Sequence, residues 1–210
     1  MKDELKQRFD LPVKYLIYSH HHYDHISGGE VFADTAVIVA HAQAKTAIIE
    51  NAVPTASPDL TFTDAMTIHL GGREVQLRHV GRNHTDNMIV MLFPAERVLF
   101  AVDFIPIRVM PWRTLGDGYF PDWIDAIKRV EALDFDILAP GHDDLGTKAD
   151  VRLIRHYFED LYSDVRSAIE SGQSLEEMQE AIRLEAYKDW PRYDEFRTMN
   201  IEGMHRILSE

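Results

Sequence analysis

The chain has 210 residues, 45% hydrophobic and 27% charged, which is typical of one globular domain with a sizeable core. Its formal net charge of −13 argues against nucleic acid as the main partner, because binding a phosphate backbone requires a basic surface. There is no cysteine, which excludes disulfides and leaves His, Asp and Glu as the side chains that can hold a metal ion.

Strand-like and helical segments alternate along the chain. Six apolar runs have the length and composition of strands, at residues 14–19, 36–40, 75–80, 88–93, 97–102 and 136–139. A hairpin turn is predicted at residues 94–96 (Pro-Ala-Glu). Helices are predicted behind Pro121-Asp122, over the amphipathic stripe at 151–169, and after a capping box made by Ser174 and Glu177. This mixture predicts a layered α/β protein.

A histidine-rich segment directly follows the first predicted strand and reads His20-x-His22-x-Asp24-His25. In an extended chain, side chains two residues apart point the same way, so His20 and His22 can bind one cation together. Asp24 and His25 can reach a neighbouring position as the chain turns. Imidazole and carboxylate ligands suit zinc, and also iron, manganese and nickel, whereas calcium and magnesium sites use oxygen ligands. The segment therefore predicts a transition-metal site.

Three further candidate ligands stand just past the ends of other predicted strands. His84 follows the strand at 75–80, Asp103 follows that at 97–102, and His142 follows that at 136–139. Taken alone, each would more often be a loop residue or a turn cap. Open α/β sheets assemble their sites where strand ends converge, so we expect these three side chains to lie beside the histidine-rich segment.

These four blocks, in this order, resemble the metallo-β-lactamase superfamily from Leu16 to about Thr147. The resemblance implies an αββα sandwich with two metals at one edge of its sheets. It implies seven ligands: His20, His22 and His84 for the first metal, Asp24, His25 and His142 for the second, and Asp103 bridging the two. Within the superfamily, a bridging Asp in a chain without Cys is most similar to the hydroxyacylglutathione hydrolases.

Three features depart from the family pattern. After His142, Asp143-Asp144 is more acidic than the common pattern. Asp86-Asn87 replaces the usual small residues after His84. Only 19 residues precede His20, where the superfamily has several strands, so we expect a first sheet that lacks N-terminal strands and a natural start other than Met1. We predict a metal-binding domain at 1–148 and a helical extension at 149–210 packed on the same domain.

The resemblance predicts a hydrolase with two divalent ions. Zinc is the expected metal, and iron and manganese are the alternatives. A metal-bridging hydroxide would attack an ester, thioester, lactone, β-lactam or phosphoester. Asp24 is the predicted catalytic residue, orienting that hydroxide and moving its proton to the leaving group. Two alternatives stay open: a mononuclear iron dioxygenase resembling the persulfide dioxygenases, and a non-catalytic binding module on the same fold.

Substrate choice is expected in residues 104–123. Ile105, Ile107, Val109, Met110, Pro111, Trp112, Tyr119 and Phe120 either line an apolar pocket or belong to the core. Arg108 and Arg113 can bind a carboxylate there. The aromatic segment at 187–193 is predicted to pack at a helix end, with contact to the substrate as the alternative. The expected partner is a small molecule, with no membrane because no apolar run approaches the roughly 20 residues of a span. A homo-oligomer is compatible with the sequence. The sequence does not indicate in which cellular compartment the protein works.

Overall fold

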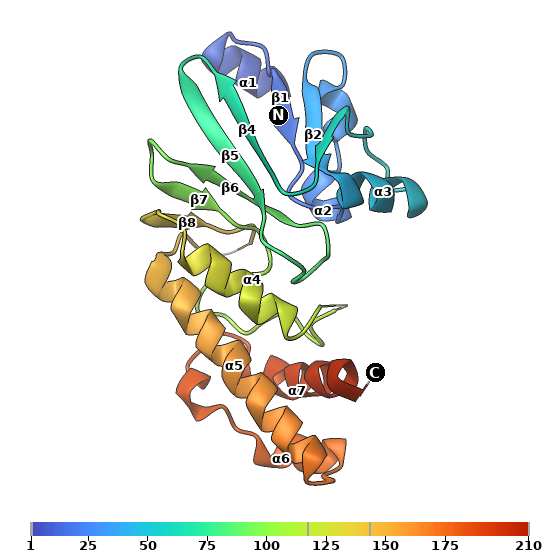
Figure 1. The fold of residues 1–210 in the computed structure, drawn as a ribbon, viewed down its shortest axis with the longest axis vertical. Coiled ribbons are helices and arrows are strands. Elements are labelled where there is room, and N and C mark those ends of the chain that lie inside the picture. The colour runs from blue at the N-terminus through green and yellow to red at the C-terminus, as the bar shows by residue number, and fades with distance from the viewer. Residues whose placement is uncertain (1, 117, 143, 210) are drawn as a thin grey trace.

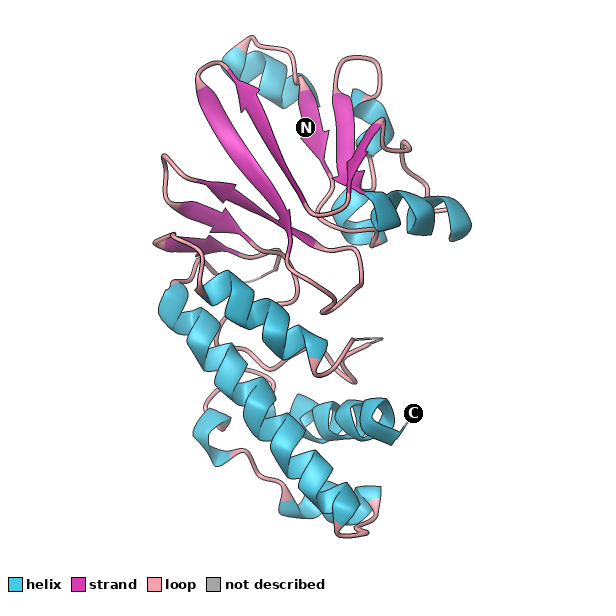
Figure 2. Ribbon diagram, viewed as in Figure 1, coloured by secondary structure: helices cyan, strands magenta, loops and turns pink. Residues whose placement is uncertain are grey.

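The computed structural model describes residues 2–116, 118–142 and 144–209. Two β-sheets form the centre of the molecule, and a helical C-terminal part extends from one end (Figure 1; Figure 2). None of the described helices is both long enough and apolar enough to cross a membrane.

The smaller sheet has three parallel strands, and the larger has five. The smaller sheet has the order β1 (Tyr15–Ile17), β2 (Val37–His41), β3 (Leu60–Phe62). The larger has the order β4 (Ala65–Leu70), β5 (Arg73–His79), β6 (Ile89–Phe93), β7 (Val98–Phe100), β8 (Ile137–Ala139). Its pairs are antiparallel except β7 with β8, which are parallel. The hairpin predicted at 94–96 is the connection between β6 and β7.

The helices lie between and after these strands. In chain order they are α1 (Lys2–Phe9), α2 (Tyr23–Ile26), the 3-10 turn η1 (Gly29–Phe32), α3 (Ala42–Glu50), α4 (Asp122–Glu131), α5 (Lys148–Glu170), α6 (Leu175–Ala181), the 3-10 turn η2 (Glu185–Tyr187) and α7 (Tyr193–Ser209). The predicted helices correspond to α4, α5 and α6. Ser174 and Glu177 form the expected capping box at the start of α6.

Successive side chains of a strand point to opposite faces of its sheet, so the buried side chains fall into separate core layers. In β6, Ile89 and Met91 face the smaller sheet, where they pack near Val39 of β2. Their neighbours Val90 and Leu92 face the opposite way, into a core shared with α4 and α5. A third buried cluster fills the space between the smaller sheet and α3. The order helix, sheet, sheet, helix is the predicted αββα sandwich, and this prediction is confirmed.

The long helix α5 continues the core beyond the second sheet. It begins at a capping box, in which Asp150 accepts a hydrogen bond from the main-chain N–H of Thr147 (2.8 Å). Its apolar stripe is buried in the same cluster as the face of the larger sheet and the side chains of α7. The division between residues 148 and 149 stays a prediction. The elements that were not predicted are α1, α2, α3, β3, β4 and the two 3-10 turns, and α7 was expected only as part of the helical extension.

Candidate metal centre

The predicted ligands converge because the strands that precede them end at one edge of the molecule. His20, Asp103 and His142 each come three residues after a strand ends, at Ile17 of β1, Phe100 of β7 and Ala139 of β8. His84 lies in the loop after β5. The structure brings all seven residues into two groups whose ligand atoms lie within 4.8 Å of one another: His20, His22, His84 and Asp103, and Asp24, His25 and His142.

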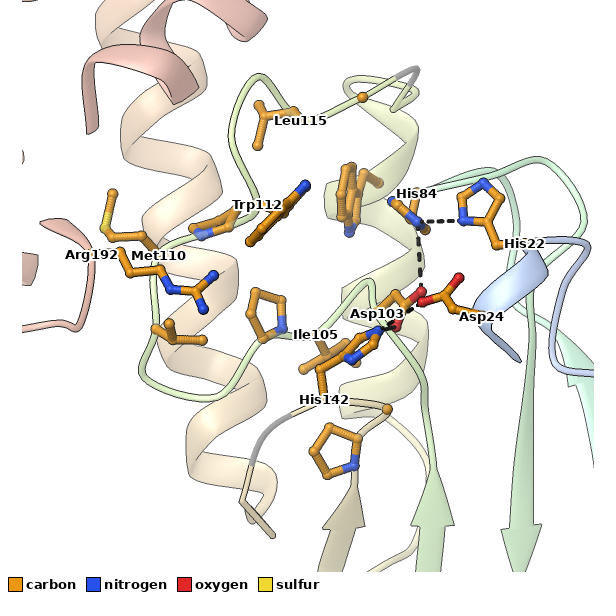
Figure 3. Close-up of a pocket in the computed structure, with 17 residues that line it drawn as sticks. His22, Asp24, His84, Asp103, Ile105, Met110, Trp112, Leu115, His142 and Arg192 are labelled. Atoms are coloured by element: carbon orange, nitrogen blue, oxygen red, sulfur yellow. Dashed lines mark hydrogen bonds and ion pairs between the residues drawn. The ribbon is translucent and has the colours of Figure 1, made fainter. Parts of the chain in front are cut away.

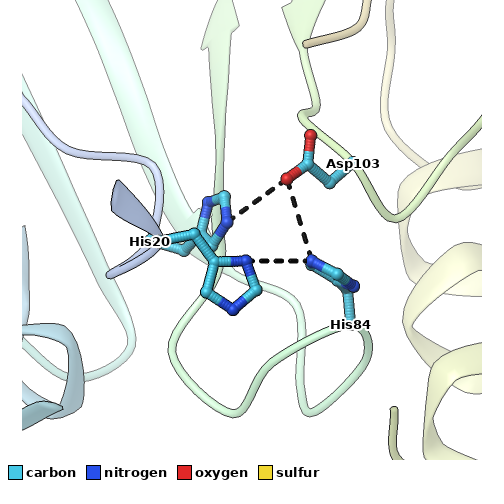
Figure 4. A group of neighbouring side chains, drawn as sticks. His20, His84 and Asp103 are labelled. Atoms are coloured by element: carbon cyan, nitrogen blue, oxygen red, sulfur yellow. Dashed lines mark hydrogen bonds and ion pairs between the residues drawn. The ribbon is translucent and has the colours of Figure 1, made fainter. Parts of the chain in front are cut away.

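Asp103 lies beside His20 and His84 of the first group (Figure 4) and also reaches two histidines of the second. Its Oδ2 lies 2.9 Å from His25 Nε2, 3.3 Å from His20 Nε2 and 3.8 Å from His84 Nε2. Its Oδ1 lies 3.4 Å from His142 Nε2. One carboxylate therefore reaches imidazoles of both groups, the position that a bridging ligand requires.

Ring nitrogens of each group approach one another, as Figure 3 shows for His84 and His22. His84 Nε2 lies 3.1 Å from His22 Nδ1, and His25 Nε2 lies 3.1 Å from His142 Nε2. The exposed carboxylate of Asp24 places Oδ2 3.1 Å from His25 Nε2 and 3.3 Å from His142 Nε2. Two neutral imidazoles that face each other through lone pairs require a proton or a cation between them.

Two buried atoms of the centre, His20 Nε2 and Asp103 Oδ1, make no hydrogen bond with any described residue. The approach of His20 Nε2 to Asp103 Oδ2 is too poorly aligned to count as one. On its other side, His20 Nδ1 lies 3.1 Å from the Ser19 hydroxyl, so the ring is oriented with Nε2 toward the centre. A buried polar atom without a partner costs about 1–3 kcal/mol, and a metal ion supplies the missing partner. The donor set therefore fits a divalent transition metal.

Burial and neighbouring charges set the protonation of these groups. Burial, with the charge of nearby imidazoles, lowers the pKa of His84 to about 3 and that of His22 to about 4. Burial also lowers the pKa of His20. Burial opposes ionisation of Asp103, but His20 and His25 outweigh it and hold its pKa well below the usual range. For His25, burial is outweighed by the Asp103 carboxylate, which raises its pKa. Neutral imidazole and ionised carboxylate are the forms that bind metal.

The backbone at Asp103 is unusual, because its φ of +46° lies in the left-handed region. Asp adopts this conformation more readily than most residues, although it still costs free energy. Phe104 N–H donates to Val102 O (2.5 Å) across the same turn. This tight turn directs the carboxylate to the histidines, and a strained backbone of this kind is typical of functional sites.

The Asp86-Asn87 pair links the two loops that carry the histidines. Asn87 is fully buried; it accepts a hydrogen bond from the main-chain N–H of His21 (3.1 Å) and donates Nδ2 to His21 Nδ1 (2.9 Å). His79 Nε2 donates to Asp86 O (3.0 Å). The departure from the family pattern after His84 thus has a structural role. The sequence marks the position as unusual without indicating its partners.

A cavity of about 640 Å³ opens beside the centre (Figure 3), a size suited to a small organic ligand. Five of the proposed ligands line one end: His22, Asp24, His84, Asp103 and His142. The walls are apolar and include Ile105, Val109, Met110, Trp112, Leu115 and Trp123. Most of the residues expected to line a pocket in the segment 104–123 do so.

Other residues of this segment follow the second alternative, the core or the surface. Ile107 and Phe120 pack against the main core, and Tyr119 lies under the guanidinium of Arg82. Arg108 is engaged elsewhere, because its Nε donates to Asp150 Oδ1 (2.7 Å) at the start of α5. Arg192, which was not predicted as a site residue, does line the cavity.

Comparison with known proteins identifies the family. A family model described as the metallo-beta-lactamase superfamily matches residues 2–142. The alpha subunit of a 2,4-dinitroanisole O-demethylase from a Nocardioides species is 29% identical over 134 residues, covering 62% of this chain and 40% of that protein. A linear primary-alkylsulfatase from a Pseudomonas species is 22% identical over 189 residues, which cover 66% of this chain and 36% of that protein. The chain therefore spans about 40% or less of the length of these curated relatives.

Solved structures share the fold. A metallo-beta-lactamase from Pontibacter korlensis superposes with a TM-score of 0.64 at 24% identity, covering 72% of this chain and 71% of that one. A metallo-beta-lactamase from Hirschia baltica gives the same TM-score at 16% identity, covering 74% of this chain and 72% of that one. At such identities these structures establish the common architecture, and the family model covers all seven predicted ligands. The chain belongs to the metallo-β-lactamase superfamily.

Proposed function

We propose that this protein is a hydrolase that uses two divalent metal ions, most simply zinc. His20, His22 and His84 would hold one ion, and Asp24, His25 and His142 the other, with Asp103 between them. The observation that carries the proposal is the position of the Asp103 carboxylate, within 3.4 Å of His20, His25 and His142. The two orphaned buried atoms, His20 Nε2 and Asp103 Oδ1, support it.

When bound, two such ions supply Lewis acidity that polarises a substrate oxygen and lowers the pKa of water toward neutrality. The protein supplies the remaining parts of the reaction. Asp24 is the exposed carboxylate at the end of the cavity, with a side chain 58% exposed. It takes a proton from the attacking water and returns it to the leaving-group oxygen as the bond to that oxygen breaks. No Ser or Cys nucleophile is needed for this sequence of steps.

The cavity supports a substrate with an apolar body. One relative is an O-demethylase of 2,4-dinitroanisole and another is a sulfatase of linear primary alkyl groups, so both names describe removal of a group from an oxygen carried by an apolar framework. The apolar walls beside the proposed ligands fit a substrate of this kind. We propose an ester of an apolar alcohol or phenol. The finer similarity to the hydroxyacylglutathione hydrolases, and with it a thioester substrate, stays a prediction.

The group formed by Asp24, His25 and His142 favours this proposal over the two alternatives. A mononuclear iron dioxygenase would leave this group without an ion, so a second ion held there is the property that separates the two functions. A binding module that performs no chemistry needs no complete set of metal ligands, whereas all seven lie in the two groups here.

The test is hydrolysis by protein purified without added metal. The panel contains 4-nitrophenyl esters of short and medium-chain acids, alkyl sulfates, and a phosphodiester. Asp24→Asn should lower kcat roughly 100- to 10,000-fold, because the proton transfer is lost. Asp125→Asn, at an exposed carboxylate of α4, is the matched control. Metal content is measured on each variant. No hydrolysis of any panel member by metal-loaded protein, or full activity in Asp24→Asn, would overturn the proposal.

A further inference from the structure

Arg192 lines the cavity from a part of the chain far from the proposed metal ligands in sequence. It lies between η2 and α7, beyond the residues that match the family model. In Figure 3 it stands on the opposite side of the cavity from Asp103 and His84, near Met110. The C-terminal helical part therefore contributes a cationic side chain to a site whose other end carries the histidines.

The backbone around Arg192 is fixed by hydrogen bonds. Met110 N–H donates to Pro191 O (3.3 Å), and Phe196 N–H donates to Arg192 O (2.7 Å). The buried side chain of Asn200 donates Nδ2 to Pro111 O (3.0 Å), which ties α7 to the cavity wall. Arg192 itself has a φ of +66°, a left-handed conformation that persists only where the surroundings hold it. The side chain thus starts from a defined position.

Two aromatic rings hold its guanidinium. The Cζ atom lies 5.2 Å from the ring centre of Trp112 and 5.3 Å from that of Phe196, within the range of cation–π contacts. Among the described residues no carboxylate pairs with Arg192, although the chain has 35 acidic residues against 22 basic ones. By contrast, Arg97 and Arg108 are both in ion pairs. The charge of Arg192 is therefore available to a ligand.

The site then has three parts: proposed metal ligands at one end, apolar walls, and an exposed guanidinium at the other end. A guanidinium binds carboxylate, sulfate or phosphate through two parallel hydrogen bonds. We infer that Arg192 is a specificity-determining residue, and that the substrate carries an oxyanion on its apolar body, remote from the bond that is cleaved. This inference rests on the proposed function for the identity of the reacting end.

The experiment compares two series of substrates. One series contains 4-nitrophenyl monoesters of dicarboxylic acids of increasing chain length, and the other the uncharged 4-nitrophenyl esters of monocarboxylic acids of the same lengths. At the length that spans the cavity, the charged ester should be preferred roughly 10- to 100-fold in kcat/KM, as expected for a hydrogen bond between charged groups. Arg192→Gln should abolish that preference by raising KM for the charged series far more than for the uncharged one. Arg192→Lys should retain part of it.

Arg113 provides a matched control. Its Cζ lies 4.7 Å from the same Trp112 ring, but Arg113 is not among the residues that line the cavity. If the preference comes from direct contact with Arg192, Arg113→Gln keeps it. Equal losses in both variants would mean that general electrostatic attraction is responsible, and this result would overturn the inference. A preference that survives in Arg192→Gln would also overturn it.

Binding separates this inference from the proposed function. The dicarboxylic acids themselves are titrated into the protein while the fluorescence of Trp112 is followed, with Trp112→Phe to assign the signal. If no ester is hydrolysed, the proposed function is wrong. The titration then still tests whether Arg192 binds an oxyanion. Weaker binding in Arg192→Gln by the same roughly 10- to 100-fold supports it, and unchanged binding overturns it.

Discussion

Gly141 lies so close to Asp103 that no side chain fits between them. A Cβ at position 141 would be 2.8 Å from Asp103 Oδ1, 2.5 Å from Val102 Cγ1 and 3.1 Å from His25 Cε1. All three separations are shorter than ordinary van der Waals contact. Glycine in the turn after β8 therefore allows the segments that carry Asp103, His25 and His142 to meet.

Gly141→Ala should therefore weaken metal binding. The added methyl displaces the Asp103 carboxylate and the His25 ring, and displacements of this kind are expected to cost roughly 10- to 100-fold in metal affinity. The measurement is zinc titration of metal-free protein by calorimetry. Gly172→Ala is the control, because its Cβ would meet nothing within 4 Å and its φ of +72° affects stability alone. Zinc binding by Gly141→Ala at the native affinity would show that the contact is unimportant.

Acid should release the two ions in a fixed order. Because the pKa of His22 is about 4 and that of His84 about 3, protons compete for these nitrogens only below about pH 5. The pKa of His25 is raised above its ordinary value near 6.5, so its protonated form already favours the metal-free protein as the pH falls through that region. Protein dialysed at successively lower pH should lose the ion held by Asp24, His25 and His142 first.

Elemental analysis of the dialysed samples measures this loss. A plateau at one ion per chain between about pH 5 and pH 6.5 is the expected result. Loss of both ions in a single step would contradict the assignment of the ligands to two groups with different proton affinities.

Asn200→Ala should destabilise the protein and loosen the cavity wall. The fully buried Asn200 accepts a hydrogen bond from Tyr157 (2.6 Å) and donates to Pro111 O (3.0 Å) and Arg113 O (2.5 Å). Its removal leaves buried groups without partners, so the free energy of unfolding should fall by about 2 kcal/mol. Urea denaturation measures the change. Asn51→Ala, at the exposed end of α3, is the control, and equal effects of the two substitutions would refute the prediction.

The sequence predicted the layers and the meeting of the seven side chains because both follow from chain direction and apolar patterning. His20, Asp103 and His142 each follow a strand, and strands that run in parallel bring their ends to one edge. One of the missed elements is the strand β4. This strand was missed although Met66, Ile68 and Leu70 alternate with Thr67 and His69, because only Ile68 belongs to an obvious apolar position of the core. The turn Gly71-Gly72, with both residues at positive φ, is the sequence signal that identifies the hairpin of β4 and β5.

The recognition part of the cavity could not be predicted in the same way. The place of Arg192 depends on how α5 and α7 pack against residues 110–113, and on a positive φ that no sequence pattern indicates. Arg108 carries the same charge but pairs with Asp150, a partner 42 residues away. The segment at 187–193 divides between the two interpretations: Tyr187 and Trp190 pack on the ring of Tyr157 in α5, whereas Arg192 lines the cavity.

The metal content of the protein tests the central claim most directly. Protein purified without added metal is analysed for zinc, iron and manganese, alongside a variant that carries His22→Ala and His84→Ala. The account predicts two ions per chain in the native protein and one in the variant, because only the group of His20, His22, His84 and Asp103 is dismantled. A native chain with no transition metal, and no binding when zinc is supplied, would contradict it.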